Sequence, residues 1–390
     1  MKHIIVLIIS LPLFMACSNL DYLASDKSVS KPKYLDQQFV QPTSFTIESE
    51  EEIFQLDDEM IYLVENVINK GKNAQSKAKR LLQQIFSEEQ ISLSYSSNAN
   101  LTARETFHSQ RANCMSLTIM AYALAKKADL NVQFQQVDVP EYWIRNGQYN
   151  LLTGHVNLLI DPNSDSRNHI VYASDKIQID FDPYAVKPSF PRKVIPKRTV
   201  LAMYYNNKGG QALVQGKYNL AYQYFKAATN SDNNFSAAWG NLAVLYRLTN
   251  NIKEAETTYR YAVAMDHNNL TSLTNLAMLL RSQNKYAEAD TIDNSVMKKR
   301  VTNPYYHAVL ADEAFYRKDY DEALKHYKKA LRLNNKIHEI YFGLAKVFYQ
   351  MDKLDDAERA MRKAIALNEA KTTEHQYVAK LNFLQAESIH

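Results

Sequence analysis

The sequence predicts an α+β domain with N-terminal helices, a cysteine-bearing helix and an antiparallel sheet, followed by an all-α solenoid of helical repeats. Three observations lead to this prediction. A chain of 390 residues is long enough for two or three domains of roughly 150 residues each. In the middle of the chain, helical stretches are followed by segments that alternate like strands. The second half is self-similar with a period of about 34 residues, which is typical of stacked helical hairpins.

Composition and charge exclude several other classes of protein. Hydrophobic residues make up 46% of the chain and charged residues 23%, with 8 Gly, 10 Pro and 2 Cys, so collagen, low-complexity disorder and a disulfide-stapled mini-protein do not fit. The net charge is +4, and basic and acidic residues are interspersed. Because nucleic-acid binding needs a clustered basic face, we expect no nucleic-acid partner. The sequence has no His-x-x-x-His or Cys-x-x-Cys spacing and no Gly-rich phosphate loop, so we expect neither a metal nor a cofactor.

The first 45 residues are typical of a targeting signal followed by a tether. A basic MKH opening precedes an apolar run over 4–14, shorter than the about 20 residues that a membrane span needs. The run ends in LFMAC, which resembles the lipobox of bacterial lipoproteins, with Phe14 where Leu is usual. The resemblance implies a signal peptide over 1–16, lipidation of Cys17, a tether over 17–45 and an outer-membrane location facing the periplasm. The alternative is an ordinary signal peptide with a coincidental Cys.

Residues 46–190 carry the pattern of the α+β domain. Apolar residues at helical spacing predict helices over 51–68, 73–87 and 113–128. Alternation predicts strands over 91–95, 132–139, 155–160, 170–173 and 177–181. We interpret residues 191–201 as a linker, at the end of a Pro-containing stretch that is expected to act as a hinge.

Three residues of this domain form a candidate catalytic group. Cys114 begins a predicted helix, where the positive end of the helix macrodipole stabilises a thiolate. A nucleophilic Cys needs a base, and the base needs an orienting group. His155 starts one predicted strand and Asp180 lies near the end of another, and neighbouring antiparallel strands place such side chains side by side. The alternatives are a buried, inert Cys and a His that serves the strand structurally.

The sequence around these residues resembles that of bacterial transglutaminase-like lipoproteins, which belong to the papain-type superfamily. The segments that carry the resemblance are ETFHSQRANCMSLTIMAYALAKKADL, QQVDVP, GHVNLLI and IQIDFDP. The resemblance implies that Cys114 is the nucleophile, His155 the general base and later acid, and Asp180 the group that orients the imidazole. Asp182, two residues further on, is the alternative for that last role.

Such chemistry also needs an oxyanion hole, made by backbone N–H groups and side-chain donors. The backbone N–H of Cys114 is a natural candidate, and Tyr95 and Gln110 are candidate side-chain donors. The sequence departs from the family at Ala112, where such proteins often carry Gly before the Asn-Cys pair. The implied reaction is attack of the thiolate on an amide carbonyl, with water or an amine resolving the thioester.

Residues 202–371 contain five units of about 34 residues that begin near 202, 236, 270, 304 and 338. The second unit shows the pattern best, in Trp239, Leu242, Ala243, Tyr246, Asn250, Ile252, Ala255, Tyr259 and Ala262. This pattern resembles the tetratricopeptide repeat, which implies stacked hairpins that bind a peptide or protein partner in a groove. The third unit is degenerate, because Asp293 and Val296 replace the aromatic residue and the Ala. Residues 372–390 are predicted to form a capping helix.

Two main hypotheses for the function follow from this organisation. In the first, the chain is an envelope lipoprotein whose middle domain is a cysteine-dependent peptidase, amidase or transamidase and whose repeats present a protein partner. In the second, the chain is a non-enzymatic scaffold or assembly factor that acts through its repeats. Binding of peptidoglycan or polysaccharide is a third hypothesis, which rests on location alone. Helix positions that are candidates to face the groove are Tyr222, Asn241, Arg247, Asn275 and Arg281.

Overall fold

A computed structural model of the chain describes residues 29–39, 46–86, 94–95, 99–109, 111–137, 143–146, 149–152, 155–161, 176–179, 181, 192–368, 377–382 and 384–385. The region before the repeats combines helices and short strands. Its elements are α2 (Glu50–Phe54), α3 (Asp58–Asn66), the 3-10 helix η1 (Ile68–Lys70), α4 (Ala74–Phe86), β1 (Ser94–Tyr95), α5 (Ala103–His108), β2 (Arg111–Ala112), α6 (Cys114–Lys127), β3 (Val132–Val137), β4 (Trp143–Asn146), β5 (Tyr149–Leu152), β6 (His155–Ile160), β7 (Ile177–Ile179) and β8 (Arg192–Ile195).

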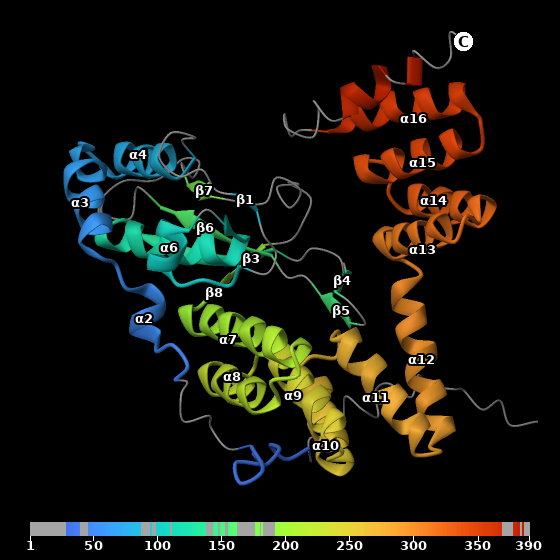
Figure 1. Ribbon diagram of the computed structural model, residues 1–390, viewed down its shortest axis with the longest axis horizontal. Coiled ribbons are helices and arrows are strands. Elements are labelled where there is room, and N and C mark those ends of the chain that lie inside the picture. The colour runs from blue at the N-terminus through green and yellow to red at the C-terminus, as the bar shows by residue number, and fades with distance from the viewer. Residues whose placement is uncertain are drawn as a thin grey trace, which may run out of the picture.

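The largest sheet of this region has four antiparallel strands in the order β7-β6-β3-β8. The register of β3 with β6 places His155 opposite Val137. Helix α6 lies against this sheet (Figure 1), and the ring of Tyr122 stacks on that of Phe134 in β3 with 4.2 Å between centroids. Two smaller pairs accompany the sheet, a parallel pair β1-β2 and an antiparallel hairpin β4-β5. A helical layer on a small antiparallel sheet agrees with the predicted α+β class.

One predicted helix is divided in two. Instead of a continuous helix over 51–68, the chain forms α2 and α3 with residues 55–57 between them. Ser49 caps α2 in a capping box with Glu52, and the side chain of Asp57 accepts a hydrogen bond from the backbone N–H of Met60 at 3.0 Å. Because the Asp57 side chain satisfies an N–H group that a continuous helix would bond to a backbone carbonyl, a second helix can begin at this point.

Residues 192–201 of the predicted linker are part of the folded structure. Residues Arg192–Ile195 form β8, an edge strand that pairs with β3 and places Ile195 opposite Phe134. The first helix of the repeats, α7 (Lys197–Val214), begins two residues after this strand ends. The ammonium of Lys197 lies 4.1 Å from the ring centroid of Phe54 in α2. The sheet therefore continues into the repeats with a single intervening residue, Pro196, rather than through a free hinge.

The helices of the repeats keep the period that the sequence shows. They are α7, α8 (Tyr218–Ser231), α9 (Ser236–Leu248), α10 (Ile252–Met265), α11 (Leu270–Ser282), α12 (Tyr286–Arg300), α13 (Pro304–Tyr316), α14 (Tyr320–Leu333), α15 (His338–Gln350) and α16 (Leu354–Leu367). From α9 onward, the first helices of successive units begin about 34 residues apart. From α8 onward, the second helices begin at the same spacing. The predicted succession of helical hairpins is therefore present.

A residue with left-handed backbone joins the two helices of every unit. These residues are Gly216, Asn250, Asn284, Lys318 and Asp352, with φ between 58° and 71°. Glycine adopts this conformation without steric cost and Asn tolerates it, whereas a Lys side chain is unfavourable there. The fourth unit therefore makes the same turn with a less suitable residue.

A second contact recurs at the start of three units. In each, the side chain at one position of the first helix donates a hydrogen bond to the carbonyl oxygen six residues earlier. These bonds run from Trp239 Nε1 to Asn233 at 2.9 Å, from His307 Nε2 to Val301 at 3.0 Å and from the Tyr341 hydroxyl to Asn335 at 3.1 Å. Because a carbonyl oxygen only accepts, Nε2 of His307 carries a proton in this bond.

Three hydrophobic cores hold the described residues together. The first lies between the sheet, its helices and the start of the repeats, and the second fills α7 to α12. Helices α7, α8 and α9 contribute buried side chains to both of these cores. The third fills α13 to α16 and the C-terminal helical residues, and among the described residues no helix contributes to both the second and the third. Figure 1 shows α13 to α16 stacked as a group that is reached through α12.

The end of the array is covered by a short helical stretch. Residues 377–382 and 384–385 are helical, and Tyr377, Leu381 and Leu384 are buried in the third core.

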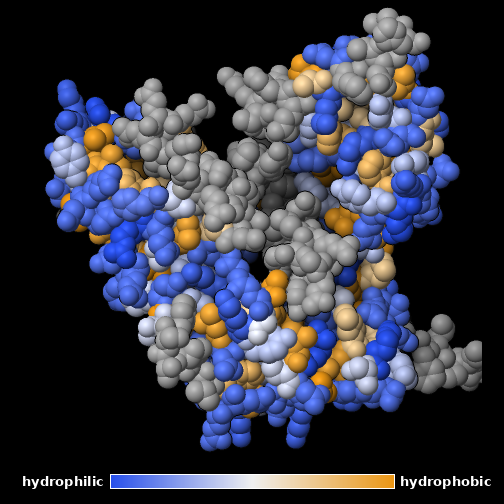
Figure 2. Space-filling view, viewed as in Figure 1, coloured by the Kyte–Doolittle hydropathy of each residue, from blue (hydrophilic) through white to orange (hydrophobic). Residues whose placement is uncertain are grey.

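On the face shown in Figure 2, hydrophobic residues occur in small groups among hydrophilic ones. No helix in the described part of the chain is both long enough and apolar enough to span a membrane.

Candidate functional site

Cys114 is the first residue of α6, and the N-cap residue Asn113 fixes the start of this helix. The side-chain oxygen of Asn113 accepts a hydrogen bond from the backbone N–H of Ser116 at 2.9 Å, as an N-cap does. The thiol is partly exposed and is not part of a disulfide.

A buried polar network anchors this helix start to its surroundings. Asn113 Nδ2 donates to Asn100 Oδ1 at 2.9 Å, and the backbone N–H of Leu101 donates to the Ser116 hydroxyl at 3.0 Å. Asn207, in the first helix of the repeats, donates to the same Asn100 oxygen at 3.5 Å. The network therefore joins the segment before α5, the start of α6 and the repeats at one point.

His155 is the first residue of β6 and is 3% exposed. Thr118 lies one turn after Cys114 on the same face of α6, and its hydroxyl donates to the carbonyl oxygen of Val156 at 3.2 Å. Side chains four residues apart on a helix lie about 5–6 Å from each other. The bond from Thr118 therefore brings the face of α6 that carries Cys114 against the start of β6. The Cys114 thiol therefore lies on a helix, and the His155 imidazole lies on the strand against which this helix packs.

The other predicted site residues are placed only in part. In the parallel β1-β2 pair, the Cα atom of Tyr95 lies opposite that of Ala112, two residues before Cys114. Gln110, Asp180, Asp182 and Cys17 lie outside the described residues. The third member of the triad, the Gln110 donor and the lipidation site therefore stay predictions. Within the described residues, no group of three or more His, Cys, Asp or Glu side chains is arranged to hold a metal ion.

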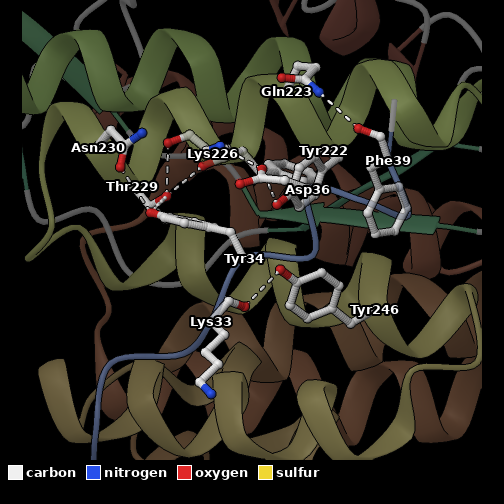
Figure 3. A network of polar contacts seen from close by, with 11 residues as sticks. Lys33, Tyr34, Asp36, Phe39, Tyr222, Gln223, Lys226, Thr229, Asn230 and Tyr246 are labelled. Atoms are coloured by element: carbon white, nitrogen blue, oxygen red, sulfur yellow. Dashed lines mark hydrogen bonds and ion pairs between the residues drawn. The ribbon is translucent and has the colours of Figure 1, made fainter. Parts of the chain in front are cut away.

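A second candidate site lies on the first two repeat units. Residues 31–39, which fall inside the predicted tether, lie across α8 and α9 (Figure 3). We call them the tail segment. The surface beneath it, the tail site, is formed by Tyr222, Gln223, Lys226, Thr229, Trp239 and Tyr246.

Asp36 is the charged contact of the tail segment. One of its carboxylate oxygens accepts a hydrogen bond from the Tyr222 hydroxyl at 2.9 Å and one from the Lys226 ammonium at 2.5 Å (Figure 3). The bond from Lys226, with a further contribution from Tyr222, holds the pKa of Asp36 below its ordinary value of 3.8, against an opposing effect of burial. The carboxylate is therefore ionised at neutral pH, as an acceptor of two hydrogen bonds should be.

Two aromatic side chains anchor the tail segment on either side of Asp36. The ring of Tyr34 stacks on Trp239 with 6.0 Å between centroids, and that of Phe39 stacks on Tyr222 at 4.5 Å. Phe39 is 3% exposed. The ammonium of Lys31 lies 5.5 Å from the Trp239 ring, within the range of a cation–π contact. Aromatic side chains are frequent among the few residues that dominate the binding energy at protein interfaces.

Polar groups of α8 and α9 satisfy further atoms of the tail segment. The hydroxyl of Tyr34 donates to Asn230 Oδ1 at 3.0 Å and lies 2.9 Å from the hydroxyl of Thr229. Gln223 donates to the backbone carbonyl of Phe39 at 3.2 Å, and the Tyr246 hydroxyl to that of Lys33 at 3.4 Å. Burial in this contact raises the pKa of Tyr34 above its ordinary value, so the hydroxyl stays protonated and able to donate.

The tail segment was not identified as a site from the sequence, which predicted a tether there. The available signal was a pair of aromatic residues, Tyr34 and Phe39, in a polar stretch. Tyr222, predicted as a groove-facing position, is fully buried beneath Phe39. Arg281, predicted in the same way, instead binds Asp293 at 2.7 Å within its own unit.

Comparisons with protein families support the repeat prediction. Models described as tetratricopeptide repeat match residues 208–269, 269–300 and 338–371, and one described as TPR repeat matches residues 311–352. The C-terminal part of the chain therefore contains tetratricopeptide repeats. No curated protein matches the sequence.

Several solved structures are similar to part of the chain. MamA from Desulfovibrio magneticus RS-1, from residue 41 to its end, is 14% identical over 45% of this chain and 98% of its own, with a TM-score of 0.25. PilF of Pseudomonas aeruginosa is 21% identical over 50% of this chain and 94% of its own, with a TM-score of 0.28. YrrB, described as a TPR protein with an unusual peptide-binding site, is 14% identical over 45% of this chain and 90% of its own, with a TM-score of 0.25.

Proposed function

We propose that this chain is an adaptor of the cell envelope whose tetratricopeptide repeats bind a peptide segment of a protein partner. The tail segment carries this proposal, because a non-helical peptide already lies across α8 and α9 and is held by hydrogen bonds, an ion pair and stacked rings. A surface that binds one such segment has the chemistry to bind another. The envelope location rests on the signal-like N-terminus and on Cys17 as a lipid anchor.

Crosslinking in living cells, followed by mass spectrometry, tests the adaptor function. Wild type would be compared with a double variant of the tail site, Tyr222→Phe with Lys226→Ala, and with Cys114→Ala. We expect crosslinked partner peptides to map onto α7 to α16, to change in the tail-site variant and to persist in Cys114→Ala. Crosslinks that map only to the region before α7, or that disappear in Cys114→Ala, would contradict an adaptor that acts through its repeats.

We propose a second function, thiol-dependent acyl transfer, because of the contact between α6 and β6. The Thr118–Val156 bond brings the face that carries Cys114 against the strand that begins with His155. The Cys114 thiolate would attack an amide carbonyl, with His155 taking the thiol proton and then delivering it to the leaving amine. Water or a second amine would resolve the thioester, and Asp180 or Asp182 would orient the imidazole.

The pH dependence of Cys114 alkylation tests this second function, in a form of the chain without residues 1–17. Unperturbed thiols titrate near about 8.5. An activated thiolate–imidazolium pair predicts fast alkylation well below that pH, and slower alkylation in His155→Ala. Asp180→Asn and Asp182→Asn would show which carboxylate supports the imidazole. Alkylation that is slow at every pH, or equal in His155→Ala, would mean an inert thiol and leave the adaptor function alone.

A further inference from the structure

We propose that the tail site is a recognition site for peptides with a tyrosine, an acid two residues later and a phenylalanine three residues after that, and that the tail segment is its displaceable resident ligand. This inference rests on the adaptor function and adds the chemistry of the partner. The partner is a protein with an exposed segment of this pattern, which replaces residues 31–39 on α8 and α9.

The contacts of the tail segment are those of a short linear motif. Its anchors Tyr34, Asp36 and Phe39 each meet the tail site through a side chain. Within itself, the segment makes one tight turn, in which the backbone N–H groups of Gln38 and Phe39 donate to the carbonyl oxygen of Leu35 at 3.0 and 3.2 Å. Because so few internal bonds define its shape, the tail site determines its conformation.

The repeats themselves indicate why the site selects an acid. Lys226 lies on α8 at the position that Arg260 has in the second unit and Arg362 in the fifth. Each of those arginines pairs with a Glu four residues earlier on its own helix, Glu256 at 2.9 Å and Glu358 at 2.6 Å.

In the first unit, the position of that Glu is occupied by Tyr222. The helix therefore offers Lys226 no acid there, and Asp36 of the tail segment supplies it, with the Tyr222 hydroxyl as a second donor. The fourth unit also lacks the Glu, but Leu324 stands at this position and offers no hydroxyl donor. Tyr222 and Lys226 thus form a pair of donors for a carboxylate, and among the five units this combination occurs in the first alone.

The aromatic anchors use side chains that the array already holds in place. Tyr222, Trp239 and Tyr246 are fully buried, and their rings pack against the second core as well as the tail segment. The Trp239 indole is fixed by its bond to the Asn233 carbonyl. Because these rings are held by the repeats, the site is preorganised, and binding of a competing peptide requires little rearrangement of its side chains.

A synthetic peptide of residues 29–41 with a fluorescent label is the probe. In the full chain with Tyr34→Ala and Phe39→Ala, the aromatic anchors of the resident ligand are missing, and we expect saturable binding of the peptide. Wild-type chain should bind it at least about tenfold more weakly, because its own tail segment competes. A peptide with Asp36→Asn should bind the double variant about tenfold more weakly than the unchanged peptide, because it loses a charge-assisted bond.

Substitutions on the repeats provide the matched control. In the double-variant background, Lys226→Ala should reduce binding about tenfold, whereas Arg260→Ala, at the equivalent position of the second unit, should leave it unchanged. Circular dichroism monitors folding. If the double variant does not fold, a chain with Asp36→Asn keeps both aromatic anchors and takes its place.

Three results would overturn the proposal: a folded variant that does not bind the peptide, equal binding of the Asp36→Asn peptide, or equal losses in Lys226→Ala and Arg260→Ala. Sedimentation gives a further test, because a wild-type dimer that dissociates in the double variant would mean that the tail segment binds a second copy instead. If the peptide fails while cellular crosslinks still map to the repeats, only this inference falls and the adaptor function stands.

Discussion

The two halves of the repeat array share one sequence period but differ in how they are held. Helices α7 to α12 are joined to the region before them through shared helices and carry the tail segment, whereas α13 to α16 form a core of their own. In both halves the helices begin at the same regular interval. The sequence period therefore determines where helices begin, whereas continuity of the hydrophobic core depends on the side chains at the junctions between units.

The boundary between the second and third cores lies next to the unit that departs from the repeat pattern. Tyr259 and Tyr327 are buried at equivalent positions in the second and fourth units, but at the third unit's position the side chain of Asp293 is 45% exposed and binds Arg281. In the fourth unit, His307 occupies the position that Trp239 has in the second. An exposed carboxylate on α12 and a buried imidazole on α13 thus stand where other units carry buried aromatic rings.

The largest predicted effects come from filling the close contacts of two glycines, one in each half. A Cβ atom at position 209 would lie 2.6 Å from the ring of Phe225, and one at position 343 would overlap the ring of Tyr327. Both rings are buried, so Gly209→Ala and Gly343→Ala should each cost about 1–3 kcal/mol. Amide hydrogen exchange should show the loss in α7 to α12 for the first variant and in α13 to α16 for the second.

Gly210→Ala is the matched control, because a Cβ atom there has no neighbour within 4 Å. In mid-helix this change should be neutral or stabilise by about 0.5–1 kcal/mol. Equal loss of protection in both halves, whichever glycine is changed, would mean that the array unfolds as one unit.

Glu48 provides the next largest effect, confined to the first half. Its carboxylate binds the Lys208 ammonium at 2.8 Å and accepts from the Tyr224 hydroxyl at 2.9 Å, and the ion pair is about four-fifths buried. Glu48→Gln should cost roughly 1–2 kcal/mol in denaturant unfolding. Glu50→Gln, which removes an exposed pair with Lys197, should cost a few tenths. Similar losses in the two variants would show that burial of the Glu48 pair is unimportant.

The stability of the two halves should respond differently to acid. Burial lowers the pKa of His307 from its ordinary value of 6.5, Lys329 and His326 act in the same direction, and the bond to Val301 opposes them. The unfolded chain therefore takes up a proton before the folded chain does, and the stability of α13 to α16 falls as the pH drops below 6.5.

Glu48 behaves differently, because burial raises its pKa but the bonds from Lys208 and Tyr224 lower it further, to below 4.5. The stability that it gives to the first half is complete above pH 4.5 and is lost only as the pH falls through the pKa of the folded state. Hydrogen exchange at pH 7 and about 5 should thus show weakening in α13 to α16 alone, and His307→Gln should reduce it. Weakening that begins in the first half would contradict this order.

The smallest predicted effect is a stabilisation of the second half. Lys318 has a φ of 63° in the turn between α13 and α14, where Gly216 stands in the first unit. Lys318→Gly removes the steric cost and adds flexibility to the unfolded chain, for a net gain of about 0.5–1 kcal/mol. Asn284→Gly, at the same position of the third unit, should gain less because Asn tolerates this backbone. A loss of stability in Lys318→Gly, measured by thermal unfolding, would contradict the steric argument.

The helices of the repeats were predictable because a strict period places small and aromatic residues at fixed points. One such point holds a buried alanine in every unit, namely Ala221, Ala255, Ala289, Ala323 and Ala357. The break after α12 was not predicted, although its signals, Asp293 and His307, were present in the sequence. A single substitution in a repeat does not reveal whether the junction closes around it, because that depends on the neighbouring helix.

The start of the cysteine-bearing helix was predictable for a local reason. Asn113 is a strong N-cap residue, and it places Cys114 at the first helical position without help from the rest of the fold. The tail site was beyond prediction because its parts lie far apart in the chain, as in the bond between Tyr34 and Thr229. Only the folded repeats bring the rings of Tyr222 and Trp239 to one surface.

Amide hydrogen exchange of residues 29–39 in the full chain tests most directly whether the first half of the array holds a peptide. We expect slow exchange in wild type, since the segment is bound to α8 and α9, and exchange at least about tenfold faster in Tyr222→Phe with Lys226→Ala, which lacks both donors to Asp36. Protection of α13 to α16 should be the same in both proteins. Unprotected exchange of this segment in wild type, or equal protection in the variant, would contradict a peptide-binding surface on the first two repeats.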